Sequence, residues 1–272
     1  MMFESFRFNY NLYGQFKNLW QFGLNLNAAS NYNDFYEPRV YGRVFHNKGR
    51  IGANGEWNSN EAKKLSWGGN FYVGEGAVTK RKTFAWGLFG KIRFSSKFSV
   101  SILANDENNT DQPGWAETLY ASGTTAMDTV IFSRRDNRNV STGLNIKYNF
   151  TNKMGITLST RHSWSKVKPL QFYVLNLQGN LETPNFDYHS NLNQNYNYLS
   201  TDLVYTWQFA QGSFINIAWK DLAETFNNQF EKNYVKNLGN TTRGPQTNSF
   251  SVRVIYFRDY LTAKNNLKKK SK

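Results

Sequence analysis

Residues 199–220 read LSTDLVYTWQFAQGSFINIAWK. Apolar residues occupy alternate positions on both sides of the short segment Ala210–Gly212. A period of two is typical of a strand whose two faces have different surroundings, because successive side chains point to opposite sides. This stretch therefore predicts two strands, 199–209 and 213–220, joined by a short turn, each with one apolar and one polar face.

The same alternation recurs along the whole chain, and a helical period of 3.6 fits none of these windows as well. We count eleven predicted strands, at 5–14, 19–28, 49–58, 65–73, 84–94, 98–105, 140–150, 155–164, 199–209, 213–220 and 249–257. The segment 128–133 is a candidate twelfth strand. The sequence therefore predicts an all-β protein.

The connections between these strands alternate in length. Those after the odd-numbered strands are short, whereas those after the even-numbered strands are mostly long, at 29–48, 106–139, 165–198 and 221–248. Strands of about ten residues with short turns at one end and long loops at the other are typical of a transmembrane β-barrel. We expect an antiparallel transmembrane β-barrel with about 11–12 strands in this chain, as an incomplete barrel. The alternative is a soluble sandwich or ligand-binding barrel with its apolar face inward.

Composition agrees with a two-faced sheet and excludes several other classes. The 272 residues have a mean hydropathy of −0.65, yet 17% are aromatic, which a disordered chain should not show. Apolar runs long enough for a membrane helix are missing, and without cysteine there is no disulfide, thiolate zinc site or cysteine nucleophile. In a membrane barrel only alternate residues face lipid, which explains the low mean hydropathy.

The 33 basic and 19 acidic side chains give a net charge of +14. Within the predicted strands the charged residues fall on the polar face, as a barrel requires, because a lipid-facing Arg or Lys at the bilayer midplane costs about 2–4 kcal/mol. A basic lumen would favour anions. The alternative is that these charges pair with acids of a missing segment, of a plug or of lipopolysaccharide. The predicted lumen residues are Arg7, Arg50, Lys91, Arg93, Lys147, Arg161, Lys220 and Arg253.

Aromatic residues near the strand ends predict two interfacial girdles, as transmembrane barrels have. Beside the short turns lie Trp20, Trp57, Phe94, Phe150 and Phe209, and toward the long loops lie Trp86, Trp164 and Trp219.

An odd number of strands conflicts with the even number of single-chain bacterial barrels. No signal peptide is visible at the start of the sequence. Both observations lead us to expect a C-terminal fragment whose missing N-terminal segment supplies an odd number of strands. We expect residues 1–260 to form the barrel portion and the lysine-rich residues 261–272 to form a basic periplasmic tail.

Candidates for catalysis or metal binding are weak. His46, His162 and His189 lie far apart in sequence, and His162 and Ser163, as neighbours on one strand, point to opposite faces and cannot pair. We expect no catalysis, cofactor or metal in this chain. Nucleic acid is not an expected partner, because the aromatic residues follow strand register rather than a recognised binding motif.

The C-terminal half resembles a known family. The residues that carry the resemblance are RRDNRN at 134–139, STDLVYTWQFAQGS at 200–213, AWK at 218–220 and PQTNSFSVRVIYF at 245–257. They are similar to the C-terminal barrel of domain of unknown function 5916, a Bacteroidota family whose members resemble outer-membrane proteins. Members usually carry an N-terminal domain like family 9 carbohydrate-binding modules, which is absent here. No catalytic motif defines the family, so the resemblance implies no functional residue.

From these observations we expect a cell outer-membrane protein in contact with lipid and lipopolysaccharide, acting in transport as a pore or in surface binding. One alternative is a plugged barrel that anchors a carbohydrate-binding module, with glycans bound through the extracellular loops. The other is an outer-membrane enzyme acting on glycan or lipid.

Overall fold

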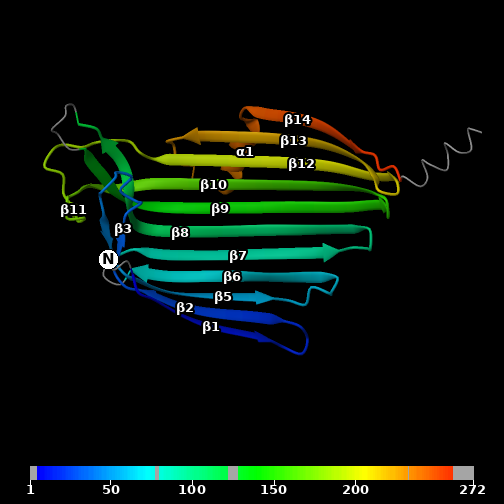
Figure 1. Cartoon of the computed structure of the whole chain (residues 1–272), viewed down its shortest axis with the longest axis horizontal. Helices are drawn as coiled ribbons and strands as arrows, with labels where there is room; N and C mark the ends of the chain where they lie inside the picture. The colour runs from blue at the N-terminus through cyan, green and yellow to red at the C-terminus, as the bar shows by residue number, and fades with distance from the viewer. Residues whose placement is uncertain (1–4, 77–79, 122–127, 232, 260–272) are drawn as a thin grey trace, which may run out of the picture.

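The computed structural model describes residues 5–76, 80–121, 128–231 and 233–259. Most of these residues form β-strands with antiparallel pairing, as predicted (Figure 1). One twelve-stranded sheet has the order β1-β2-β5-β6-β7-β8-β9-β10-β12-β13-β14, with β11 paired to β10, and β3 and β4 form a separate hairpin. The strands are β1 (Arg7–Gln15), β2 (Gln21–Ala29), β3 (Tyr32–Asp34), β4 (Phe45–Asn47), β5 (Arg50–Asn58), β6 (Leu65–Gly76), β7 (Lys82–Arg93), β8 (Phe98–Leu119), β9 (Thr129–Thr151), β10 (Met154–Leu175), β11 (Leu181–Glu182), β12 (Gln194–Ala210), β13 (Ser213–Asn227) and β14 (Gln246–Ile255).

The hairpin quoted above forms β12 and β13. Leu203 lies opposite Trp219, so apolar residues of the two strands share a face. Gly212 occupies the turn with φ +70°, a left-handed conformation that glycine adopts without steric cost. All eleven predicted strands correspond to strands of the main sheet.

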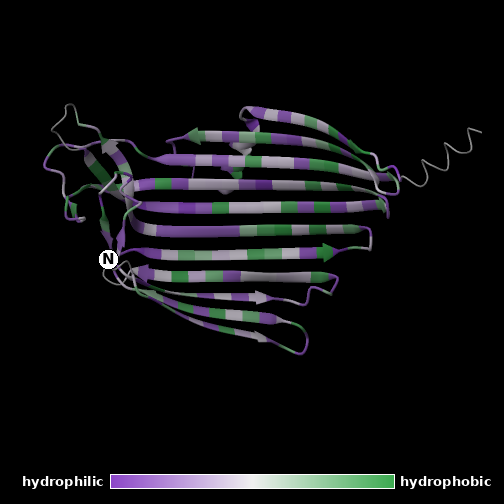
Figure 2. Ribbon diagram, viewed as in Figure 1, coloured by the Kyte–Doolittle hydropathy of each residue, from purple (hydrophilic) through white to green (hydrophobic). Residues whose placement is uncertain are grey.

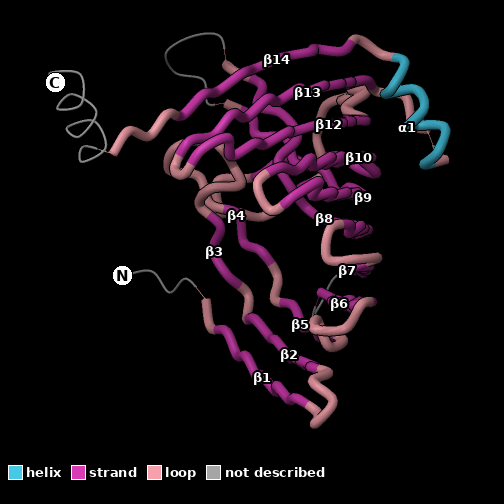
Figure 3. The backbone as a smooth tube through the Cα atoms, turned by 90° about the vertical axis from the view of Figure 1, so that its right-hand side faces the viewer, coloured by secondary structure: helices cyan, strands magenta, loops and turns pink. Residues whose placement is uncertain are grey.

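The sheet is curved and has two different faces. Viewed along the strands, it forms an arc from β1 to β14, with the β3–β4 hairpin on the concave side and the helix α1 (Tyr234–Arg243) on the convex side (Figure 3). The strand register places the apolar positions of neighbouring strands together on the convex face, as in the row Leu65, Ile92, Val100, Ile146, Leu158, Leu203, Trp219 and Phe250.

Three central strands are much longer than the sequence predicts. The expected loops 106–139 and 165–198 were wrong in large part, because β8 continues to Leu119, β9 begins at Thr129 and β10 continues to Leu175. Segment 128–133 is accordingly the start of β9 and not a separate strand. The extension of β8 carries Asn and charged residues, as the hydrophilic left-hand part of β8 in Figure 2 shows, so it lacks the alternation that identifies a strand. The extensions of β9 and β10 contain runs of successive apolar residues, at 130–132 and 172–175, which also interrupt the alternation.

A small apolar core lies at the long-loop end of the sheet. Phe45 of β4 packs against Phe132 of β9 with ring centroids 4.9 Å apart. The cluster also contains Val130 and Leu175, with Val40, Trp115, Tyr173 and Leu181 around it. The β3–β4 hairpin, which lies within the expected loop 29–48, therefore folds over the extended strands.

Helix α1 was not predicted. Its N-cap Asn233 accepts a hydrogen bond from the backbone N–H of Lys236, and Asn237 pairs with Asn197 of β12 through their side-chain amides. The Tyr234 hydroxyl contacts His162 Nδ1 at 2.9 Å and Thr142 Oγ1 at 2.7 Å. Within the described part of the chain, no helix has both the length and the apolar character needed to cross a membrane.

The sheet remains open among the residues described. β1 pairs only with β2, and β14 pairs only with β13, so each has one edge without a neighbouring strand. Every residue of β14 is exposed.

Candidate functional site: the concave polar face

The register places all eight predicted basic residues on the concave face. One row of residues paired from strand to strand crosses this face. It contains two of the eight basic residues, Lys91 and Lys220, and one acid, Asp202. The row consists of Ser66, Lys91, Ser101, Asn145, Ser159, Asp202, Lys220 and Ser249.

The other six basic residues occupy neighbouring rows of the same face. Arg93 and Lys147 belong to a single row through Ser99, which faces both of them. Arg7 and Arg50 lie opposite the same residue, Ala29, at the long-loop end. Arg161 lies opposite Gly143 and Ser200, and Arg253 lies opposite Asn216.

These basic side chains are not neutralised by ion pairs. None of the eight takes part in a salt bridge within the described ranges, although Asp202 faces Lys220 across the strand pair. The Arg93 guanidinium instead donates to the backbone carbonyls of Glu61 and Lys63, at 2.6 and 2.7 Å. The face therefore has an excess of positive charge that is open to solvent and mobile anions.

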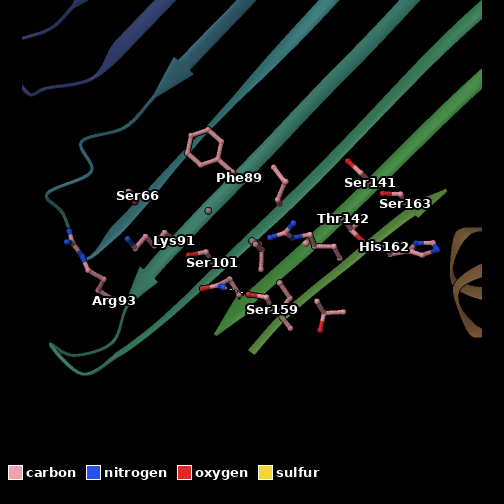
Figure 4. Close-up of a pocket in the computed structure, with 18 of the residues that line it drawn as sticks. Ser66, Phe89, Lys91, Arg93, Ser101, Ser141, Thr142, Ser159, His162 and Ser163 are labelled. Atoms are coloured by element: carbon pink, nitrogen blue, oxygen red, sulfur yellow. Dashed lines mark hydrogen bonds between the residues drawn. The ribbon is translucent and has the colours of Figure 1, made fainter. Parts of the chain in front are cut away.

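A hollow of about 640 Å³ lies over the middle of this face. Lys91, Arg93 and Arg161 line it together with serine, threonine and asparagine side chains, and Glu61 is the one acidic residue in its wall. Figure 4 shows Lys91 and Ser101 side by side within it, whereas the His162 ring points away from them toward the helix. The lining thus combines three cations and neutral polar groups with apolar residues that include Phe89 and Leu103.

A second hollow of about 490 Å³ lies near the long-loop end of β1, β2 and β5. Arg7 and Arg50 line it with the amides of Asn9, Asn25 and Asn27. Tyr32 of the β3–β4 hairpin also borders it, so the hairpin covers part of the concave face here.

His162 and Ser163, the neighbouring histidine and serine of β10, lie on opposite faces of the sheet. His162 lies beneath α1 on the convex side, and Ser163 lines the concave hollow, so the two side chains point apart as the sequence predicts. Over the ranges that the structure describes, no group of three or more His, Cys, Asp or Glu residues could hold a metal ion.

The predicted short-turn aromatics lie at that end of the sheet and form ring contacts there. Trp20 meets Trp67 edge to face with centroids 5.3 Å apart, and Phe94 stacks on Phe98 at 5.0 Å. The remaining members contact other residues: Phe150 meets Tyr148, Phe209 meets Trp207 and Tyr256, and Trp57 lies opposite Phe22 and Gly69.

The three aromatics predicted near the long loops have different surroundings. Trp86 lies opposite Asp106, and the Trp219 indole N–H donates to Asn248 at 2.9 Å. Trp164 departs from the predicted girdle, because it is 2% exposed, donates to Asn195 and lies against Tyr234 of α1. It is therefore shielded from the surroundings by the helix.

Two features of the site region were missed by sequence reasoning. Tyr234 stands on the unpredicted helix, and Arg81 is an ordinary loop residue in sequence that the β3–β4 hairpin buries. The predicted basic tail at 261–272 lies outside the described residues.

No curated protein matches this chain. A family match covers residues 1–267, which is almost the whole sequence, and its description is Domain of unknown function (DUF5916). The chain therefore belongs to the DUF5916 family.

Proposed function

We propose that this chain forms part of the wall of an outer-membrane β-barrel, with its convex face in lipid and its basic concave face lining a polar lumen. The observation that carries the proposal is the exposure of large apolar side chains across the convex face. Soluble monomers rarely expose apolar patches of more than a few hundred Å². The exposed convex residues include Phe8, Tyr10, Leu12, Leu26, Ile51, Leu65, Trp67, Phe71, Val73, Phe84, Leu88, Ile92, Ile102, Tyr148, Trp207, Trp219, Phe250, Val252 and Val254.

The apolar belt has a height suited to a membrane. On β7 it runs from Phe84 to Ile92, with Lys82 on the same face just beyond it. At about 3.4 Å per residue this stretch is about 27 Å long. Tilted by about 40°, it would span about 21 Å, near the ~25 Å apolar band of outer-membrane barrels.

The upper limit of the belt runs diagonally across the sheet. On β13 the belt ends at the convex-face acid Asp221, and the row of paired residues through Asp221 meets β7 at Gly90. On β7 itself the belt ends at Lys82, which lies farther toward the long loops than Gly90. A belt that crosses the rows of paired residues at an angle is expected when the strands are tilted relative to the barrel axis. Closed barrels require such a tilt, typically about 35–45°.

The two free edges restrict how the barrel can close. β1 and β14 both run from the long-loop end toward the short-turn end, because each successive strand of the main path is antiparallel. They therefore cannot pair antiparallel to each other. Closure in an all-antiparallel barrel needs an odd number of further strands between them, which gives the even total of bacterial single-chain barrels.

The basic concave face supports transport of anions or retention of anionic solutes, through unpaired charges such as Lys91 and Arg161. A plugged barrel that serves as a glycan-binding platform is the second candidate. It is favoured by one observation: the β3–β4 hairpin lies on the concave side and borders the hollow beside Arg7 and Arg50 (Figure 3).

Conductance across a planar bilayer tests this proposal, with the protein extracted from outer membranes. We expect ion conductance with anions preferred over cations, and a reduced preference in the double variant Lys91→Glu, Arg161→Glu. Lys82→Glu, which changes a charge beyond the belt on the convex face, is the matched control and should keep the preference. Inserted protein that conducts no ions would contradict the transport role and favour the plugged platform. Protein that is fully soluble and never inserts would contradict the barrel itself.

A further inference from the structure

Arg81 is a buried cation whose hydrogen-bond partners are neutral. It precedes β7 in the loop after β6 and is 8% exposed. Its Nη1 donates to Asn47 Oδ1 at 3.0 Å, and its Nη2 donates to the Lys48 carbonyl oxygen at 3.3 Å. Among the residues described, no carboxylate forms an ion pair with it. Buried charges in proteins are normally paired, because an uncompensated one is costly.

The charged side chain that acts on Arg81 is another cation, Arg50. Burial lowers the pKa of this arginine, and repulsion from Arg50 lowers it further, while Tyr32 opposes both effects. Asn47 is held in place as an acceptor for Arg81, because its own amide donates to the Tyr32 hydroxyl at 2.7 Å. The guanidinium is thus fixed in position, and it retains donors beyond the two that these bonds use.

A hollow of about 500 Å³ adjoins Arg81 on the side of the loops. Lys48 and Lys80, both exposed, line it beside Arg81. The one acid in the wall is Asp111, and its carboxylate is already paired with Arg134. The lining also includes the apolar or aromatic side chains of Phe45, Pro113, Tyr173 and Leu181.

We propose that this hollow binds an organic oxyanion, with its carboxylate, phosphate or sulfate group held by Arg81, Lys48 and Lys80 and its body against Phe45 and Tyr173. The guanidinium supplies directional donors for the oxyanion, and the two lysines supply charge at the mouth. A sugar acid or a sugar phosphate has both the anionic group and a body that can lie against the rings. The site rests on the contacts of Arg81 and does not depend on whether the sheet closes into a barrel.

Titration calorimetry on the full protein in neutral detergent tests the proposal, with glucuronate and glucose 6-phosphate as probes. We expect both to bind and glucose, which lacks the anionic group, not to bind. Lys48→Gln and Lys80→Gln should each weaken binding severalfold, and Arg81→Gln should weaken it by more than about tenfold, because it removes the fixed donors. The matched control is Lys82→Gln, next along the chain but paired with Glu75 at 3.9 Å outside the hollow.

Two further measurements keep the outcome decisive. Arg81→Gln can disturb the loop, whereas the replaced lysine side chains are exposed. The two lysine variants must therefore show weaker probe binding while their unfolding temperature without probe stays the same as that of the wild type. The second arm compares binding to nanodiscs of phosphatidylglycerol with binding to nanodiscs of phosphatidylcholine. Binding to the phosphatidylglycerol nanodiscs but not to the soluble probes would assign the oxyanion to a lipid headgroup. Equal affinity in wild type, Lys48→Gln and Lys80→Gln, or no binding in either arm, would overturn the proposal.

Discussion

Arg138 of β9 and Asp106 of β8 form a two-point ion pair on the convex face of the sheet. Arg138 Nε donates to Asp106 Oδ1 at 2.9 Å, and Nη2 donates to Oδ2 at 2.6 Å. Lys82 and Glu75 form a looser pair on the same face of β7 and β6. In the proposed barrel such pairs stand just beyond the apolar belt, where convex-facing charges can meet water and headgroups.

Replacing Asp106 should therefore weaken the long-loop end of the sheet. We expect Asp106→Asn to lower the free energy of unfolding by about 1 kcal/mol, because the pair is partly exposed and solvent screens it. The change can be measured as the denaturant midpoint of the heat-modifiable gel shift. Glu107→Gln, which alters the next residue on the opposite face, is the control. Equal effects of both substitutions would show that the convex-face pair has no special role.

A cation placed in the middle of the belt should block folding into the membrane. Leu88 of β7 is 46% exposed on the convex face, and its neighbour Phe89 is 37% exposed on the concave face. We expect Leu88→Arg to cost about 2–4 kcal/mol at the bilayer midplane, whereas Phe89→Arg faces the polar side and is tolerated. The readout is the fraction of protein that folds into lipid vesicles. If Phe89→Arg were the more damaging change, the assignment of the two faces would be reversed.

Tyr188 should lose its hydroxyl proton at a higher pH than an ordinary tyrosine. Burial and its hydrogen bond to Glu117, at 2.6 Å, raise the pKa of Tyr188 from 10.0 to about 12. A raised pKa means that this contact stabilises the fold fully below about pH 10 and that the stabilisation is lost between about pH 10 and 12. Ultraviolet absorbance of tyrosinate should show a late step that disappears in Tyr188→Phe. Tyr41→Phe, which removes an exposed tyrosine, should keep that step.

The free edges give a prediction about closure. If an odd number of strands lies between β1 and β14, cysteines placed at Tyr10 and at residues 248, 250, 252 or 254 will not react with a short thiol crosslinker in the folded protein. Leu12 and Leu24, which face each other on β1 and β2, supply the positive control. The chain contains no native cysteine, so any crosslink must join the two introduced cysteines. Efficient crosslinking between β1 and β14 would show direct parallel closure instead.

Much of this architecture can be predicted from the sequence, because the alternation of apolar and polar residues is a local property. It identifies the eleven strands of the main path and, by parity, the common face of residues as distant as Arg7 and Arg253. Once neighbouring strands pair in register, the odd or even position of Arg7 and Arg253 along their strands is enough to place both side chains on the polar face.

The parts that could not be predicted depend on contacts between distant segments. The extensions of β8 and β9 have polar residues on both faces and are held by pairs such as Arg138 with Asp106. Helix α1 contains Gly239 and two threonines, which are poor helix formers, and is stabilised by its Asn233 cap and by packing on β12. Arg81 is buried beside the β3–β4 hairpin, where Asn47 of β4 accepts its hydrogen bond.

The membrane wall is tested most directly by a single-cysteine scan of β7 from Phe84 to Ile92, in protein folded into lipid, with a spin label at each position. We predict that accessibility to oxygen, which partitions into lipid, peaks at Phe84, Trp86, Leu88 and Ile92. Accessibility to a water-soluble nickel reagent should peak at the intervening positions, including Phe89 and Lys91. A convex face shielded from both reagents would show instead that it packs against protein, as in a soluble sandwich, and would contradict the membrane wall.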